Sequence, residues 1–301
     1  MTTPENLIPN LEAEKARIFT AYDTFRDAVA PFTDRYAGSG YDTNEDSNLV
    51  NQGQNTLVFR LELGDKSFVV KVPRVVRENV AGLVNDIVEA NVRVLSIPGY
   101  ERIVAASPEG VIVSEQIVGS DLADISPEDL SCITDDQIDN YVQAIIEGHA
   151  HGISIDPKPA NVMYDPEKGF TIVDYSRFDN TTDEYKASPT VALSWGVEPF
   201  VYGGLGDGDR GEVIRDSSRI SEIAKMKLPI IEKYIKAVEV HLGKIDQQDI
   251  FPNLDSALLH LKREAFDMEG LILERETIRR QREMSRLAYD PAIHGELDSF
   301  V

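Results

Sequence analysis

Several residue types that mark particular protein classes are scarce in this 301-residue chain. Its single cysteine, Cys132, cannot form an internal disulfide, which favours a reducing compartment. Apolar runs stay well short of a membrane span. The N-terminus also lacks the basic segment and apolar stretch of a secretory signal. These absences predict a cytoplasmic protein that does not act in a membrane.

Basic side chains are few as well. The chain has 30 Lys and Arg against 52 Asp and Glu, a formal net charge of −22. Nucleic acids and anionic membranes are held by clustered cations, so this balance argues against both as partners. Hydrophobic residues make up 42% of the chain and charged residues 27%, which is typical of a globular protein.

The apolar pattern predicts a small β-rich half followed by a larger helical half, joined near Val118-Gly119-Ser120. Strands are expected at 56–63 and 67–72 around the tight turn Gly64-Asp65-Lys66, and at 102–106 and 111–115. Helices are expected at 8–36, 76–95, 135–149, 212–242, 254–264 and 263–288.

The most informative segment is Asp156-Pro-Lys158-Pro-Ala-Asn161, followed thirteen residues later by Asp174 at the end of an apolar strand. A tight loop of this spacing brings a carboxylate, an ammonium and an amide oxygen together. Amide and carboxylate oxygens from Asn161 and Asp174 suit Mg²⁺, a hard cation that prefers oxygen ligands and phosphates. Phosphoryl transfer needs little beyond such positioning and charge neutralisation.

These motifs resemble those of the protein-kinase-like superfamily, whose catalytic loop carries Asp-x-Lys-Pro-x-Asn and whose metal-binding aspartate follows at this spacing. The resemblance implies an α+β, two-lobed kinase-like fold. Its parts would be an N-terminal helical extension and loop at 1–47, an N-lobe at 48–118 and a C-lobe at 119–301 with a divergent helical end. It also implies that Asp156 and Lys158 are catalytic, with Asn161 and Asp174 as the metal ligands.

The same resemblance extends upstream through the expected strands. Gly53 lies in the position of the glycine-rich loop, and Val58 in that of the strand residue beneath adenine. Lys71, in Phe68-Val-Val-Lys71, would reach the α- and β-phosphates of ATP. Its partner on the next helix is predicted to be Glu89, with Glu78 as the alternative.

The segment Val113-Ser-Glu115-Gln-Ile117 resembles the family's hinge. It implies a small residue, Ser114, at the back of the adenine site, and backbone groups of Glu115 and Ile117 that bond adenine. Asp121 takes the position of an acid on the ribose.

The resemblance implies an ATP- and Mg²⁺-dependent enzyme that transfers the γ-phosphate to a hydroxyl acceptor, expected to be an atypical Ser/Thr protein kinase. The family's His-Arg before the catalytic aspartate is replaced by Ser154-Ile155, which disfavours activation through a phosphorylated loop. Beyond 176 the signatures of peptide binding are not readable. Three alternatives stay open: a small-molecule kinase of the aminoglycoside or choline type, a nucleotide-binding pseudokinase acting through interactions, and nucleotide transfer from an inverted ATP pose. The acidic charge favours a basic acceptor.

Three other motifs are interpreted structurally. His149 and His151 stand at a predicted helix end, where capping of the last carbonyls is favoured over metal binding. The glycine-rich stretch Gly206–Gly211 lacks the strand and helix of a dinucleotide fingerprint and is interpreted as a loop. The arginine-rich segment 274–286 alternates with acids, as on a solvated helix face.

Overall fold

The computed structural model describes residues 10–36, 48–52, 56–73, 79–123, 125–156, 158–178, 186, 189–202 and 217–244. These residues form an α+β fold with one antiparallel sheet near the N-terminal end and several helices after it. Within them, no helix is both long and apolar enough to cross a membrane. The expected helices at 254–264 and 263–288, the 274–286 segment and the 206–211 stretch all lie outside the described residues.

Five antiparallel strands form the main sheet, in the order β1-β2-β3-β5-β4. They are β1 (Leu49–Gln52), β2 (Thr56–Leu63), β3 (Lys66–Pro73), β4 (Ile103–Ala106) and β5 (Ile112–Glu115). The predicted hairpin is confirmed: β2 and β3 pair along their whole length around a turn in which Gly64 has a φ of +64°. Positive φ is open to glycine without steric penalty, so the turn residue fits its conformation.

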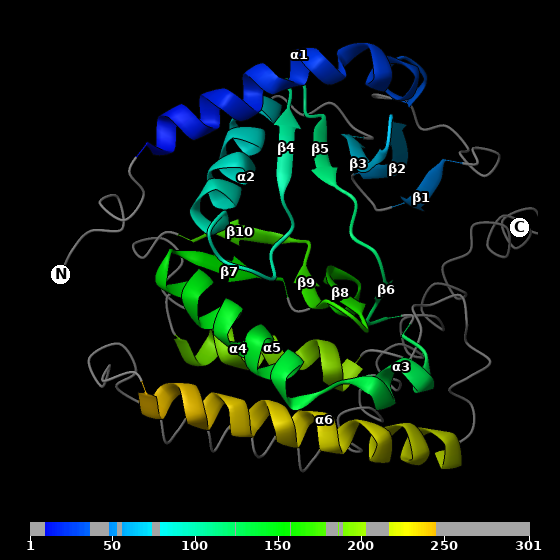
Figure 1. The fold of residues 1–301 in the computed structure, drawn as a ribbon, viewed down its shortest axis with the longest axis vertical. Coiled ribbons are helices and arrows are strands. Elements are labelled where there is room, and N and C mark those ends of the chain that lie inside the picture. The colour runs from blue at the N-terminus through cyan, green and yellow to red at the C-terminus, as the bar shows by residue number, and fades with distance from the viewer. Residues whose placement is uncertain are drawn as a thin grey trace, which may run out of the picture.

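Helices α1 (Leu11–Tyr36) and α2 (Val80–Val94) pack against this sheet (Figure 1). Alternate residues of β3, Phe68, Val70 and Val72, join Val29 and Phe32 of α1 in one buried cluster. Because successive side chains of a strand point to opposite faces, Lys71 lies on the face away from α1. The helix predicted at the N-terminus therefore covers the back of the sheet.

A second group of short strands follows the sheet. The strands β6 (Ser120–Asp121), β8 (Val162–Asp165) and β9 (Gly169–Ile172) form a three-stranded sheet in the order β6-β8-β9. A two-stranded sheet pairs β7 (Ile153–Ile155) with β10 (Tyr175–Arg177). The predicted catalytic loop runs from β7 to β8 and includes the short 3₁₀ turn η2 (Pro159–Asn161).

Four helices complete the described fold: α3 (Pro127–Cys132), α4 (Asp135–Ala150), α5 (Pro189–Tyr202) and α6 (Ser217–Lys244). Thr134 and Gln137 form a capping box at the start of α4, which satisfies free backbone donors there. In Figure 1, α4 and α5 lie between the short strands and α6. Their apolar faces share one core around Tyr141, Phe200 and Tyr234, and α4 also contacts the short strands β7 and β9.

The two histidines at the end of α4 are held by backbone carbonyls. His151 is the C-cap residue, and its Nδ1 lies 2.8 Å from the carbonyl oxygen of Glu147. Nε2 of His149 lies 3.3 Å from the carbonyl oxygen of Lys186. The capping interpretation is confirmed for His151.

Gly119 stands in the chain between β5 and β6, and we expect its replacement by alanine to destabilise the fold. Its φ is +118°, and a Cβ there would overlap the carbonyl oxygen of Tyr164. Backbone strain of this kind costs about 1–3 kcal/mol before any steric overlap is added. Thermal unfolding of Gly119→Ala should therefore begin several degrees below that of the wild type, at roughly 2–4 °C per kcal/mol.

The matched control is Gly64→Ala, because Gly64 also has positive φ but no atom within 4 Å of an added Cβ. Its loss should be limited to the conformational strain of about 1–2 kcal/mol. Equal losses in the two variants would contradict the steric argument for Gly119.

Candidate functional site

The predicted catalytic loop and the segment around Asp174 are joined by backbone hydrogen bonds. The amide of Asp156 donates to the carbonyl oxygen of Asp174 at 3.3 Å. The amide of Val173 donates to the carbonyl oxygen of Asn161 at 2.9 Å. The pairing of β7 with β10 continues this connection on one side. Three of the predicted residues, Asp156, Asn161 and Asp174, are thus held together at the ends of short strands.

Lys158 forms an ion pair with Asp156, with 2.5 Å between Nζ and Oδ2. The hydrogen bond to Asp156 is the main reason that the pKa of Lys158 is raised; the charges of Asp156 and Asp174 add to it and burial opposes it. The Asp156 side chain is 31% exposed and that of Lys158 69%. Both groups are therefore open to an incoming molecule, and the ammonium stays protonated.

Lys71 reaches the same place from the sheet. Its Nζ lies 3.4 Å from the carbonyl oxygen of Val173, the residue before Asp174. It also forms an ion pair of 2.7 Å with Glu101. Val58 is the cross-strand partner of Lys71 in β2, so the two side chains lie side by side on one sheet face. The structure therefore brings the predicted lysine to the predicted metal-binding aspartate.

The pKa of Asp174 is raised. Removal of water by the surrounding protein contributes most, the carboxylates of Asp156 and Glu101 add to it, and the cations of Lys71 and Lys158 act against it. A carboxyl group in this environment has its charge incompletely compensated by the protein. A divalent cation would complete that compensation.

The donors at this place fit Mg²⁺. Asn161, in η2, offers an amide oxygen, and Asp174 offers a carboxylate. Two oxygen donors are a usual protein contribution, because Mg²⁺ keeps several waters and takes substrate phosphates as further ligands. No cluster of three or more His, Cys, Asp or Glu able to hold a metal occurs among the described residues.

The predicted pairing of Lys71 with Glu89 is wrong in this structure. Glu89 lies on α2 and accepts hydrogen bonds from Arg93 at 2.8 Å and from Arg177 at 2.7 Å. Nζ of Lys15, on α1, lies 3.6 Å from Oε2 of Glu89. These three cations hold the Glu89 carboxylate. Lys71 instead forms its ion pair with Glu101, a residue just before β4. The sequence argument missed Glu101 because it required the partner to lie on a helix.

The predicted hinge continues β5 and is fixed on both sides. The amide of Glu115 donates to the carbonyl oxygen of Arg102, and that of Gln116 to the carbonyl oxygen of Ser67. Ser114 shares the sheet face of Lys71, is fully buried, and its hydroxyl has no hydrogen-bond partner within the described residues. Ile117 is half-buried and follows directly. The segment that leaves β5 is thus bonded to both the 102 and the 67 backbone, and the hinge role of Glu115 and Ile117 stays a prediction.

Asp121 lies in β6 opposite Met163 of β8. The next residue, Leu122, donates its amide to the carbonyl oxygens of Pro159 and Val162, at 3.2 and 2.9 Å. The segment after the hinge is therefore tied to the predicted catalytic loop. Gly53 and the alternative Glu78 lie outside the described residues.

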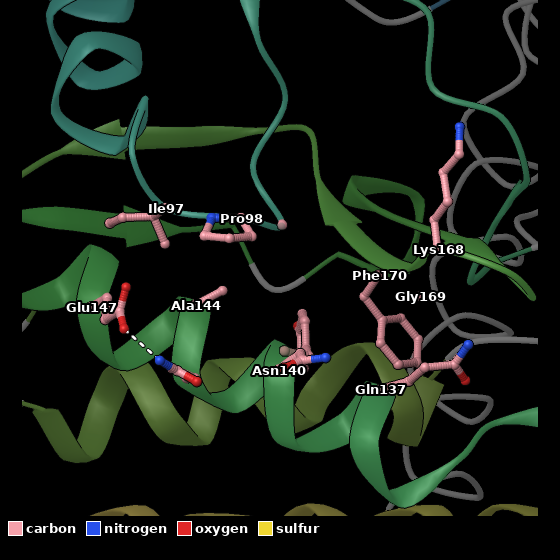
Figure 2. A pocket seen from close by; sticks show the side chains of 12 residues that line it. Ile97, Pro98, Gln137, Asn140, Ala144, Glu147, Lys168, Gly169 and Phe170 are labelled. Atoms are coloured by element: carbon pink, nitrogen blue, oxygen red, sulfur yellow. Dashed lines mark hydrogen bonds between the residues drawn. The ribbon is translucent and has the colours of Figure 1, made fainter.

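A separate pocket of about 300 Å³ opens beside α4 (Figure 2). Its walls are polar side chains of that helix, such as Gln137, Asn140 and Glu147, the turn at 97–99, and the start of β9 with Phe170. None of the predicted site residues lines it. The residues with candidate chemistry therefore lie elsewhere, between β3, the 156–161 loop and Asp174.

No protein-family model matches the chain, and a search of curated proteins finds no significant match.

Proposed function

We propose that this protein is an ATP- and Mg²⁺-dependent phosphotransferase with the two-lobed arrangement of the protein-kinase-like superfamily. The observation that carries the proposal is the convergence of Lys71 from β3, Asp156 and Asn161 from the 156–161 loop, and Asp174 from the segment after β9. One cation, one exposed carboxylate and one oxygen pair for a metal are the groups that phosphoryl transfer uses. The face of Val58 and Lys71, bordered by Ser114, would hold the nucleotide.

In this mechanism Lys71 binds the α- and β-phosphates. Asn161 and Asp174 would hold the metal ion, which would supply neutralisation of the phosphate charge. Asp156 accepts the proton of an acceptor hydroxyl as its oxygen forms a bond to the γ-phosphorus. The bond from that phosphorus to the oxygen bridging to the β-phosphate breaks, and ADP leaves with the bond's electron pair. Lys158, 2.5 Å from Asp156, stabilises negative charge on the transferred group.

The overall charge of −22 makes these two lysines more important, since most of the surface repels a polyanion. Lys71 and Lys158 place positive charge at the candidate site, and the metal adds more. We therefore expect nucleotide binding that depends strongly on Mg²⁺. A hydroxyl-bearing acceptor with basic groups is the class that such a surface attracts.

The binding step is tested by thermal unfolding with ATP, Mg²⁺ or both. At a ligand concentration 100 times Kd, binding stabilises the folded state by about 2.7 kcal/mol. For a chain of this size, that stabilisation corresponds to a shift of several degrees. We expect the shift only when ATP and Mg²⁺ are present together, and we expect Lys71→Met to lose most of it.

The control is Lys66→Met, which removes an exposed lysine from the start of the same strand, β3. It should respond to Mg²⁺ and ATP as the wild type does. A wild type that is not stabilised by the combination, or a Lys71→Met variant that responds fully, would contradict the proposal.

A further inference from the structure

We propose that Glu101 is the residue that positions Lys71 on the nucleotide phosphates, in place of a glutamate from helix α2. This inference rests on the proposed phosphotransferase function. It adds a positioning residue at a place in the chain, the segment between α2 and β4, that the sequence motifs did not indicate.

The direct contact is a short and shielded ion pair. Nζ of Lys71 lies 2.7 Å from Oε2 of Glu101, and the Glu101 side chain is 6% exposed. The Lys71 side chain is 25% exposed, so its ammonium remains open on one side. A charge pair that is partly withdrawn from water is screened less than a surface pair. Glu101 can therefore hold the lysine in one orientation while leaving it able to contact an anion.

The backbone of Glu101 is fixed to the strand that leads to Asp174. Its amide donates to the carbonyl oxygen of Ile172 at 2.9 Å. Its carbonyl oxygen accepts from Nδ2 of Asn91 at 2.8 Å and from the hydroxyl of Tyr175 at 2.9 Å. Asn91 also donates to the Tyr175 hydroxyl at 2.7 Å, and both groups are buried.

These bonds join three segments into one unit. Asn91 belongs to α2, Glu101 is the ion-pair partner of Lys71, and Tyr175 directly follows Asp174. Oδ1 of Asn91 is buried and has no hydrogen-bond partner among the described residues, but its Nδ2 and the Tyr175 hydroxyl both bond to the Glu101 carbonyl oxygen. Moving Glu101 would therefore leave two buried donors without this acceptor. The distance from Lys71 to Asp174 is therefore set by Glu101 and its anchors. In catalytic terms, Glu101 aligns the phosphate-binding lysine with the metal-binding aspartate.

Glu89 is committed to a different set of contacts. It is held by Arg93 and Arg177 through hydrogen bonds and lies near Lys15. Releasing it to reach Lys71 would leave the buried Arg93 without its carboxylate. Glu101 needs no such rearrangement.

The experiment compares Glu101→Gln, Glu101→Asp and Glu89→Gln with the wild type, in labelled γ-phosphate release or transfer assays well below each variant's unfolding temperature. Loss of lysine alignment should lower kcat/KM for ATP in Glu101→Gln by about 100-fold, the cost of a displacement of about 1 Å. KM for ATP should rise, because Lys71 contacts the nucleotide. Glu101→Asp keeps the charge and should recover part of the loss, while Glu89→Gln should unfold earlier but keep KM for ATP within about twofold.

Acylation of Lys71 by an amine-reactive reagent, followed by mass spectrometry, gives a readout independent of turnover. Labelling should be faster in Glu101→Gln than in Glu89→Gln, because only the first variant loses the carboxylate paired with the amine. An active wild type whose Glu101→Gln variant matches it in kcat, KM and labelling would overturn the inference alone. So would an active enzyme in which Glu89→Gln, and not Glu101→Gln, raises KM. A wild type with neither Mg²⁺-dependent ATP binding nor transfer would overturn the proposed function and, with it, the nucleotide role of Glu101, even if Lys71 labelling still reported the ion pair.

Discussion

Replacing Asp156 by asparagine is expected to lower kcat for phosphoryl transfer by about 10³-fold, within the usual range for losing a general base. The carboxylate lies at the start of the 156–161 loop, is 31% exposed, and its backbone amide is bonded to Asp174. Asparagine has nearly the same shape but cannot accept the hydroxyl proton. Mg²⁺-dependent ATP binding should persist, because Lys71, Asn161 and Asp174 remain.

Asp174→Asn should behave differently and lose both binding and transfer. This carboxylate is the charged metal ligand of the proposed site, and desolvation by burial is the main cause of its raised pKa. Measuring kcat together with the Mg²⁺-dependent thermal shift therefore separates the two roles. The matched control is Asp65→Asn, in the exposed β2–β3 turn, which should leave both measurements unchanged.

Two outcomes would contradict the assignment. If Asp156→Asn transfers phosphate at the wild-type rate, Asp156 is not the base. If Asp174→Asn retains a full Mg²⁺-dependent thermal shift, Asp174 is not a metal ligand. The raised pKa of its carboxyl would then reflect burial alone.

Local patterns predicted many of the described elements because those elements carry their own signal. The β2–β3 hairpin has strand alternation and a glycine turn, and α4 has helical periodicity with Thr134 and Gln137 at its start. Helix α5 was not predicted. Its sequence is apolar on almost every side, since it is buried between α4 and α6, so it has no polar face to mark the helical period.

The candidate site likewise had a part that local sequence could predict and a part that depends on distant contacts. Asp156, Asn161 and Asp174 are close in sequence and linked by short strands, so their spacing was enough to predict their convergence. The partner of Lys71 was not predictable in this way, because Glu101 is 30 residues away and its position depends on buried bonds to Asn91 and Tyr175. The available signal was a single acid two residues before the apolar β4 strand.

Of the substitutions proposed here, Glu89→Gln is expected to lower the free energy of unfolding most. The loss should be about 3–5 kcal/mol, the usual cost of breaking a buried ion pair. Glu89 is 10% exposed and joins three elements, through Lys15 of α1, Arg93 of α2 and Arg177 of β10. Without the carboxylate, the side chain of Arg93, 7% exposed, keeps its charge and loses its main partner. Thermal unfolding should begin about 10 °C lower, at roughly 2–4 °C per kcal/mol.

The matched control is Glu14→Gln on α1, which removes a pair with Arg17 whose side chains are 40% and 57% exposed. Exposed pairs of this kind contribute about 0–1 kcal/mol, so unfolding should change little. Similar losses in the two variants would mean that burial of the Glu89 cluster does not govern its contribution.

The pH dependence of the Glu89 effect follows from its ionisation. Burial acts to raise the pKa of this carboxyl, but hydrogen bonds and charges from Arg93 and Arg177 outweigh burial and hold the pKa below its ordinary value of 4.5. The unfolded chain therefore takes up a proton at higher pH than the folded protein does. The stabilisation is complete above the unfolded-state pKa and is lost as the pH falls through the folded-state pKa. The difference in unfolding temperature between the wild type and Glu89→Gln should thus be largest near neutrality and shrink below pH 4.5. A difference that stays constant on acidification would show that Glu89 stabilises the fold by packing and not by its charge.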